Sequence, residues 1–355
     1  MTQEFNPAYK ATMDAIMASG KRGVVFPSAP NSPGVVYGPG MDAGGTSTGL
    51  VFLAGELEKQ DPRLLEPLTT ITAPRDIDMK PGGGWTSITS NVFVDYAMSG
   101  SDEDSIIGSE TNNIPVSQAN ISKDVFKVHT FSEILRAPLF DDLKLQQIGK
   151  SLSTILDDGI RLHHAKMIDR NVYVGVSKTA TYGLVNSPLV TAGSVALGAS
   201  GHTQWNTKTP LEIMYDINDA LTQTVINSAW SLEGMANRIL IDWANYAYIA
   251  NTPVTVAGAQ SILNYLLENN IAVNQGGELQ IFPLSWCTGA GVGPTQRMVA
   301  YRKAENRINI DLPVPLSRVM TAPNTTSASY ETIFASQFSQ CKILYYTCLE
   351  YRDGI

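Results

Sequence analysis

A long polar segment, VDYAMSGSDEDSIIGSETNNIPVS at residues 94–117, constrains this chain more than any other feature. It stands between two stretches rich in β-branched and aromatic residues, WTSITSNVFVDYAM and ISKDVFKVHTFSEI, which are typical of strands. Structureless loops longer than about 12–15 residues are uncommon inside compact domains and are usually functional or disordered. The sequence therefore predicts a long hairpin over residues 84–134, with a polar, acidic tip and no core of its own chain to lie on.

Composition allows a large core or two smaller ones, because 43% of the 355 residues are hydrophobic. Only 16% are charged, below the usual quarter, which favours a protein that covers much of its surface with partners. The net charge of -8 provides no basic stripe of the kind that binds nucleic acid. No apolar run reaches the 18 or so residues of a membrane span, and the N-terminus lacks the layout of a signal peptide. We expect synthesis in the cytosol and no membrane partner.

The three cysteines are predicted to be reduced and structural. Cys341 and Cys348 fall on one predicted strand, CKILYYTCLEY, about 23 Å apart and on opposite faces. A disulfide needs Cα atoms within about 7 Å, so these two cannot pair within that strand. Cys287 stands alone in the sequence.

The first part of the chain is predicted to be an arm followed by a helix. Asn6 and Pro7 suit the N-cap and first position of a short amphipathic helix. Residues 20–49 hold eight glycines and four prolines, a composition typical of an extended or irregular path. A helix is expected over residues 50–68.

The rest of the chain predicts an α+β fold with mixed sheets. Apolar spacing indicates a helix over residues 140–172, roughly 45 Å long, and a second over 209–229, capped by Thr209. A strand–turn is expected at residues 182–190 and a proline-broken crossing at 308–323. The remaining predicted elements are strands at residues 238–243, 279–286, 297–303 and 342–351, and a helix at 259–270.

Two motifs resemble those of enzymes but lack the surrounding elements. GTSTG at residues 45–49 fits the pattern of a hydrolase nucleophile elbow around Ser47, but GPGMDAG before it cannot be a central strand. The stretch Gly38-Pro39-Gly40-Met41-Asp42-Ala43 fits a loose dinucleotide fingerprint, but no acidic residue ends a second strand about twenty positions later.

The polar clusters favour structural roles. His163 and His164 are adjacent, so on a helix they point about 100° apart and cannot hold one metal ion together. Asp157 and Arg161, four residues apart, are expected to form a surface ion pair. The acidic triplet of residues 102–104 lacks the glycine at the sixth position of a calcium loop. We therefore expect no catalytic, cofactor-binding or metal-binding residues, no cofactor and no enzymatic activity.

The order of these parts resembles the major capsid protein of tailed bacteriophages, which has the Hong Kong 97 type fold. In that family an N-terminal arm precedes a long two-stranded loop, the E-loop. A spine helix then follows in a peripheral (P) domain, before an axial (A) domain. Segments of this chain resemble the family in the same order over residues 50–355. They are FLAGELEKQDPRLLE, SNVFVDYAM through FKVHTFSEILRAPLF, the tetrad Gly183-Leu184-Val185-Asn186, LEIMYDINDALTQTVINS with RILIDWANYAYI, and the closing ILYYTCLEYRDGI.

The resemblance implies an α+β, Hong Kong 97-like capsid fold with six parts. These are an N-terminal arm (1–50), a helix and connection (51–83), the E-loop hairpin (84–134), the P domain with its spine helix (135–232), the A domain (233–325) and a C-terminal return to the P domain (326–355).

The resemblance further implies a phage-head protein that self-assembles into the hexamers and pentamers of an icosahedral shell around packaged double-stranded DNA. The protein would be assembled in the bacterial host's cytoplasm and located in the virion. Its partners would be copies of itself, a portal protein, scaffolding or decoration proteins, and DNA in non-specific proximity. In such a shell the E-loop lies across a neighbouring subunit, which would supply the core that the hairpin lacks. The alternatives are the shell of an encapsulin-like bacterial nanocompartment and a hydrolase that uses Ser47.

Some relatives cross-link their subunits through a lysine near the E-loop tip. Here no lysine lies between Met98 and Ser122, and Lys80 and Lys123 flank the loop. We expect a shell held together by non-covalent contacts.

Overall fold

The computed structural model describes residues 69–99, 115–147, 152–255, 258 and 260–355. The predicted arm (1–50), the predicted helix at 50–68 and the candidate residues Gly38, Gly40 and Ser47 lie outside the described residues. So do Asp102, Glu103 and Asp104 of the hairpin tip.

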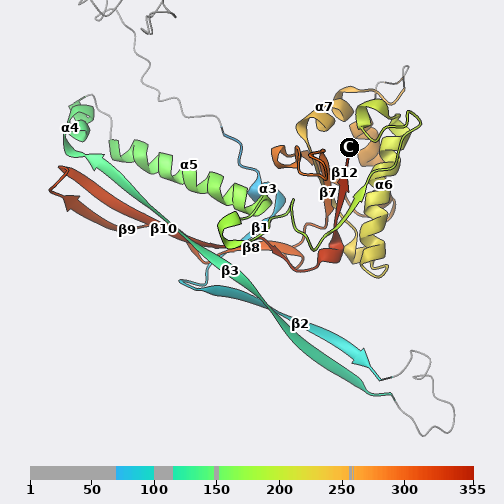
Figure 1. Ribbon diagram of the computed structural model, residues 1–355, viewed down its shortest axis with the longest axis horizontal. Helices are drawn as coiled ribbons and strands as arrows, with labels where there is room; N and C mark the ends of the chain where they lie inside the picture. The colour runs from blue at the N-terminus through green and yellow to red at the C-terminus, as the bar shows by residue number, and fades with distance from the viewer. Residues whose placement is uncertain (1–68, 100–114, 148–151, 256–257, 259) are drawn as a thin grey trace, which may run out of the picture. The chain divides into compact units, whose positions relative to one another are not determined.

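Three sheets organise the described part of the chain, so the predicted mixture of helices and sheets is confirmed (Figure 1). The three-stranded sheet contains β1 (Asp78–Pro81), β8 (Ile308–Leu312) and β11 (Lys342–Ile343). The four-stranded sheet has the order β2 (Ile88–Met98), β3 (Ser117–Pro138), β10 (Ser329–Ser339) and β9 (Val314–Asn324). The five-stranded sheet has the order β4 (Thr191–Ser194), β12 (Leu349–Asp353), β7 (Arg297–Tyr301), β5 (Arg238–Ile241) and β6 (Gln280–Pro283).

Seven α-helices accompany these sheets in the described residues. They are α3 (Ala73–Asp76), α4 (Leu139–Gln147), α5 (Leu152–Tyr173), α6 (Pro210–Asn227), α7 (Trp243–Asn251), α8 (Ile262–Glu268) and α9 (Ile271–Asn274). Among the described residues, no helix is both long and apolar enough to cross a bilayer.

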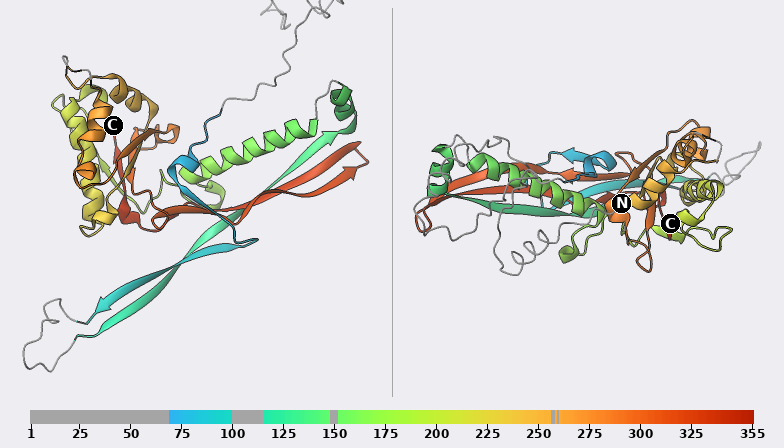
Figure 2. Two further views of the ribbon diagram at one scale, coloured as in Figure 1. Left: turned by 180° about the vertical axis from the view of Figure 1, so that it is seen from behind. Right: turned by 90° about the horizontal axis from the view of Figure 1, so that it is seen from above.

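The predicted hairpin is confirmed as an antiparallel ribbon of β2 and β3, seen in Figure 1 and in the left view of Figure 2. Its register runs from Ile88 opposite Lys127 to Met98 opposite Ser117. Beyond Lys127, β3 leaves β2 behind and pairs along its other edge with β10. One strand of 22 residues therefore belongs both to the ribbon and to the four-stranded sheet.

The single helix predicted over residues 140–172 is described as two helices, α4 and α5, on either side of residues 148–151. Helix α5 covers one face of the four-stranded sheet, as Figure 1 shows. That face carries Leu135 and Ala137 of β3 and Phe334 of β10. The register sets Phe334 opposite Glu133, and Glu133 lies on the same face as Leu135 and Ala137 because alternate strand residues share a face. They pack against Ile160, with Leu152 and Leu156 at the margin.

The predicted cap of the second long helix is confirmed. The side chain of Thr209 accepts a hydrogen bond from the backbone N–H of Glu212, and the Glu212 carboxylate accepts one from the backbone N–H of Thr209. This capping box satisfies two N–H groups that the first turn of a helix leaves without intrahelical partners. Pro210 occupies the first helical position, where its missing N–H costs nothing.

The five-stranded sheet is buried on both faces, which explains the apolar runs in its strands. Ile239 and Ile241 of β5 point to the side covered by α6 and α8. Leu240, between them, points into a second core that also contains Val172 and Tyr173 at the end of α5. Because successive strand residues alternate between faces, both faces of β5 need apolar side chains.

The proline-broken crossing at 308–323 proves to be two strands, β8 and β9, separated by Pro313. Strand β9 tolerates Pro315 and Pro323 because it lies at the edge of its sheet, where one row of N–H groups has no strand partner among the described residues. Strand β10 was not predicted from the sequence. The strand predicted at 238–243 ends earlier than expected, since Asp242 caps α7.

The predicted last strand, 342–351, is wrong as one element. It divides into β11, a 3-10 turn at Tyr346–Cys348 and β12. Cys341 and Cys348 therefore do not share a strand, but all three cysteines are free and buried, as predicted. Burial raises the pKa of the Cys341 thiol to about 12.

The predicted strand–turn at 182–190 contains a turn but no strand. Asn186 holds this turn, since its Oδ1 accepts from the Gly183 N–H at 2.8 Å and its Nδ2 donates to the Val174 carbonyl at 2.8 Å. A Cβ at position 183 would lie 2.2 Å from the backbone carbon of Tyr173, so this approach requires glycine.

Candidate functional site: the exposed face of the β2–β3 ribbon

The two faces of the β2–β3 ribbon differ sharply in chemistry. The register sets Val94 opposite Ile121 and Tyr96 opposite Ala119, and directly opposite residues share a face. Six exposed apolar side chains therefore lie on one face, and we call them the apolar ribbon face. They are Ile88, Val92, Val94, Tyr96, Ile121 and Val125.

Several large apolar side chains on this face are far more exposed to solvent than such residues usually are. Val94 is 51% exposed, Ile121 is 72% exposed and Tyr96 is 77% exposed. Covering six such side chains would contribute on the order of 5–10 kcal/mol of transfer free energy, before the costs of association. Ser90, Lys123 and Lys127 lie on the same face, but exposed apolar side chains gathered in this number mark an interaction site.

The opposite face of the ribbon holds it to the rest of the chain at its base. Phe126 is buried there, and the Lys342 ammonium lies 5.8 Å from the centre of its ring. Lys342 also donates to Asn91 of β2 at 3.3 Å, and Phe93 meets the ring of Tyr345 edge-on at 5.8 Å. Farther along the ribbon this face carries polar residues. The apolar ribbon face is thus the side that the described residues leave without cover.

A second exposed apolar row lies on α6. Leu211 and Tyr215, four residues apart, are both more than half exposed. They lie on one side of the helix, because residues at this spacing are neighbours on a helical surface. The row is shorter than the apolar ribbon face.

The two adjacent histidines contact different partners, as their predicted divergence requires. His163 is exposed and lies 2.8 Å from Glu133 through its Nδ1. His164 is buried and its Nε2 lies 2.7 Å from the Ser336 hydroxyl. Burial, with a smaller effect of His163, lowers the pKa of His164, which keeps it neutral at pH 7. The described residues hold no cluster of three or more His, Cys, Asp or Glu side chains able to bind a metal ion.

The predicted ion pair of Asp157 with Arg161 is wrong. Asp157 instead lies 2.7 Å from Arg318 of β9, across the space between α5 and the sheet. Among the predicted flanking lysines, Lys80 pairs with Glu305 at 3.0 Å, and Lys123 lies exposed on β3 opposite Val92.

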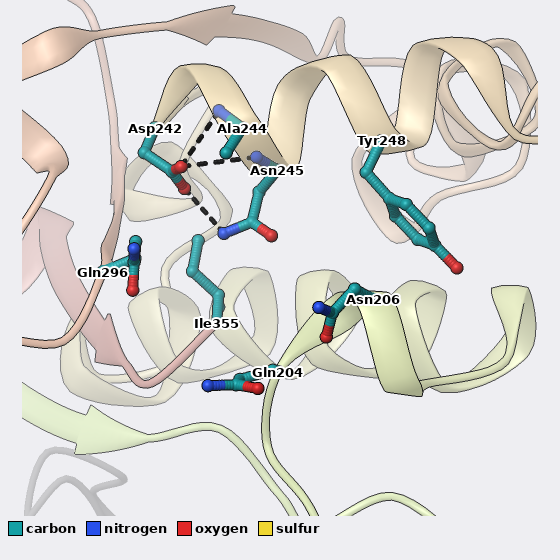
Figure 3. A pocket seen from close by; sticks show the side chains of 8 residues that line it. All are labelled: Gln204, Asn206, Asp242, Ala244, Asn245, Tyr248, Gln296 and Ile355. Atoms are coloured by element: carbon teal, nitrogen blue, oxygen red, sulfur yellow. Dashed lines mark hydrogen bonds between the residues drawn. The ribbon is translucent and has the colours of Figure 1, made fainter.

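A small pocket beside α7 lacks the combination of side chains that a catalytic site needs (Figure 3). Its volume is about 310 Å³ and most of its polar groups are carboxamides, including Gln204, Asn206 and Gln296. The carboxylate of Asp242 already caps α7 through the N–H of Ala244 at 3.0 Å, and it also accepts from the Asn245 side chain at 2.6 Å. The lining residues include no histidine, serine, cysteine or lysine that could act as a nucleophile with a base.

The members of the apolar ribbon face were not singled out from the sequence. The period-two pattern of Val92, Val94 and Tyr96 was the available signal. That pattern alone does not identify an apolar face of the ribbon, because the register is needed to show that Ile121 and Val125 lie on the same side.

Comparison with known proteins decides what kind of molecule carries this ribbon. The family model described as major capsid protein matches residues 102–355. The chain belongs to the major capsid protein family. It is therefore a structural protein of a virion's capsid shell and not an enzyme. None of the curated protein sequences compared matches this capsid protein.

Solved capsids share the fold of this capsid protein. The capsid of Myoviridae phage XM1 has 16% sequence identity and a TM-score of 0.69, over 85% of this chain and 98% of the other. The capsid of a native GTA particle has 10% identity and a TM-score of 0.58, over 86% and 98%. Microbacterium phage Oxtober96 has 12% identity and a TM-score of 0.56, over 84% and 93%. These likenesses confirm the predicted Hong Kong 97-type α+β capsid fold.

Proposed function

We propose that this capsid protein builds the icosahedral head of a tailed bacteriophage, as hexamers and pentamers that enclose packaged double-stranded DNA. The observation that carries the proposal is the apolar ribbon face, which the described part of the chain leaves without cover. A neighbouring copy would cover it, and contacts of this kind belong to obligate assemblies that bury about 2,000–5,000 Å².

The domain assignment within the fold is part of the proposal. The β2–β3 ribbon supports an E-loop over residues 84–134, and α5 supports a spine helix in a P domain over 135–232. An A domain would occupy residues 233–325. Strand β10 pairs with β3, which supports a return of the chain to the P domain after residue 325. The final strand differs, because β12 pairs with β7 and β4 in the five-stranded sheet. We therefore propose that residues 349–353 belong to the A domain, together with β4 and α6, which lie on the same sheet although the sequence assigned them to the P domain.

The remaining partners follow from the same proposal. A head that fills with DNA needs a portal, and scaffolding or decoration proteins would act at its inner or outer surface. The net charge of -8 would keep the shell from adhering to DNA phosphates, so that packaged DNA can be released. Tight binding of duplex DNA to assembled shells at low salt would contradict this part.

The test is electron microscopy with light scattering on the purified full chain at rising concentration. Rings of five or six subunits, or closed shells, are the expected result. Shells that enclose a protein cargo when isolated from cells would instead support a nanocompartment. A chain that stays monomeric at high concentration and with a crowding agent would overturn the proposed function.

A further inference from the structure

The pocket beside α7 is lined mainly by neutral polar side chains (Figure 3). Half of its eight lining residues are carboxamides from three separate parts of the chain, namely Gln204, Asn206, Asn245 and Gln296. The phenol of Tyr248 lines the pocket as well, and Ala244 and Ile355 provide apolar surface. Each carboxamide has both a donor and an acceptor, so the pocket offers both kinds of group side by side.

Most of these polar groups are not used within the chain. The side chains of Gln204, Asn206 and Gln296 make no hydrogen bond to another described residue. The Tyr248 hydroxyl makes none to the described residues either. Asn245 donates through its Nδ2 to Asp242 at 2.6 Å, which leaves its Oδ1 as an acceptor. Such groups bond to water, and a ligand with matching groups can replace that water.

Buried neighbours hold the backbone that carries the unused carboxamides. Trp205, which separates two of them, is fully buried, and its indole donates to Asp216 at 3.0 Å. Arg297, which follows the third, is buried and donates twice to Asp353, at 2.6 and 2.8 Å. The walls of the pocket are therefore fixed before a ligand arrives, which lowers the cost of binding.

The lining residues exclude several classes of ligand. They include no Lys, Arg or His, so no cation compensates the charge of a phosphate or a carboxylate. The one carboxylate, that of Asp242, is buried and already accepts from the Ala244 N–H and from Asn245. A cation would therefore find no free carboxylate. A neutral ligand rich in hydroxyl groups fits best, because a hydroxyl both donates and accepts.

The size of the pocket suits one sugar ring. Its volume of about 310 Å³ lies at the lower end of the range for ligand pockets. A pyranose has hydroxyl groups around its rim and C–H groups on its faces. The hydroxyl groups would meet the carboxamides, while the C–H groups would meet the aromatic ring of Tyr248 and the apolar surface of Ile355.

We propose that this pocket binds a neutral sugar, as one pyranose unit, through the carboxamides of Gln204, Asn206 and Gln296. The site adds ligand binding to the structural role of the protein, and a single chain carries all of it. A shell would repeat the site in every subunit, so weak binding at one site would become strong binding to a surface that displays many sugars.

The first test measures binding of sugars to the full chain, held at a concentration below assembly, by saturation-transfer NMR. The neutral probes are glucose, galactose, mannose and N-acetylglucosamine. The charged probes are glucuronate and glucose 6-phosphate, and adenosine represents a nucleobase. We expect at least one neutral sugar to bind with a dissociation constant on the order of 1 mM, and both charged sugars to bind at least tenfold more weakly. Binding of no neutral sugar, equal binding of the charged sugars, or binding of adenosine alone would overturn the proposal.

The second test locates the binding with paired variants. Gln204→Ala with Asn206→Ala removes two exposed carboxamides of the pocket and should weaken binding at least tenfold. Asn264→Ala with Gln275→Ala removes two exposed carboxamides outside the pocket and should weaken it less than twofold. Equal weakening by the two pairs would overturn the proposal. Ala244→Phe, which adds a ring at the pocket wall, should abolish binding, and thermal unfolding verifies that each variant is folded.

The assembly of the same variants separates this proposal from the proposed function. If the wild type forms shells but binds no sugar, the proposal fails and the proposed function stands. If, in addition, Gln204→Ala with Asn206→Ala prevents assembly, the pocket is a contact between copies of the chain and not a sugar site. If the wild type binds a sugar but never associates, the proposed function fails and the sugar site stands.

Discussion

The carboxylate of Asp169 in α5 accepts a hydrogen bond of 2.8 Å from the backbone N–H of Ala73, at the start of α3. The same carboxylate oxygen accepts from the Thr72 N–H at 2.7 Å, and the other accepts from the Trp286 indole at 3.2 Å. Asp169 thus caps a helix that begins 96 residues earlier in the chain. At the other end of α3, the Tyr173 hydroxyl donates to Asp76 at 2.6 Å. Two residues one turn apart on α5, Asp169 and Tyr173, therefore fix residues 72–76 in place.

Removing this cap should destabilise the fold. Asp169→Ala leaves the buried N–H of Ala73, the half-buried N–H of Thr72 and an indole N–H without an acceptor, and we expect a loss of about 3 kcal/mol in the free energy of unfolding. Urea denaturation of the unassembled chain measures it. Asp158→Ala, at an exposed position of the same helix, should change stability by less than about 0.5 kcal/mol. Equal effects of the two substitutions would show that the cap contributes nothing.

Two glycines should respond in opposite directions to the same substitution. Gly159 lies within α5 with open space where the methyl group of an alanine would lie, so Gly159→Ala should stabilise the chain by about 1 kcal/mol. Gly183→Ala would place its Cβ against the backbone of Tyr173, and we expect a loss of more than about 3 kcal/mol or failure to fold. Thermal unfolding of both variants provides the comparison. A stable Gly183→Ala protein would contradict the described turn.

Glu350 should make the stability of the unassembled chain depend on pH. Burial raises the pKa of this carboxyl to about 7, although Arg352 and a hydrogen bond from Asn227 oppose the shift. Because the pKa of Glu350 is higher in the folded state than in the unfolded state, its contribution to the free energy of unfolding is fully present below about pH 4.5. That contribution is lost as pH rises through about 7. Between pH 5 and pH 8 the free energy of unfolding should therefore fall by roughly 1–3 kcal/mol less in Glu350→Gln than in the wild type.

Urea denaturation at pH 5 and pH 8 measures the effect of Glu350. Glu305→Gln serves as the control, because Glu305 lies in an exposed pair with Lys80. That substitution should leave the difference between the two pH values as in the wild type. A Glu350→Gln protein with the wild-type difference would show that Glu350 is ionised throughout.

Assembled shells should separate fully into monomers in denaturant. No lysine lies in the hairpin between Met98 and Ser122, and Lys80 is engaged with Glu305. Boiling mature shells in detergent under reducing conditions and separating the products by electrophoresis should give one band at the monomer mass. A ladder of higher masses would establish covalent links between subunits.

The sequence predicted those elements whose local signals agree with their surroundings. The hairpin strands alternate, and α6 has a cap, a first-turn proline and an apolar stripe. Strand β10 escaped prediction because it buries polar residues and so shows no alternation. Ser336 is satisfied by His164, and Gln337 bonds to Thr130 and to the Thr86 N–H.

Other features depend on partners distant in the sequence, which a local pattern cannot show. The split of the last predicted strand into β11 and β12 arises because β11 pairs with β8 while β12 pairs with β7. Arg318 draws Asp157 away from the helical neighbour that its spacing favoured. The apolar ribbon face likewise required the register between two strands. The hairpin was predictable, but its uncovered side was not.

The most direct test of the account is whether the apolar ribbon face drives assembly. Val94→Asp with Ile121→Asp places two carboxylates on this face, where neither residue supports the chain's own core. Asn120→Asp, on the polar face of the same ribbon, is the matched control. Light scattering of the three proteins at rising concentration, with unfolding curves to confirm equal stability, makes the measurement. We predict that the wild type and the control assemble, while the double variant needs at least tenfold more protein or stays monomeric. Assembly of the double variant at the wild-type concentration would contradict the account.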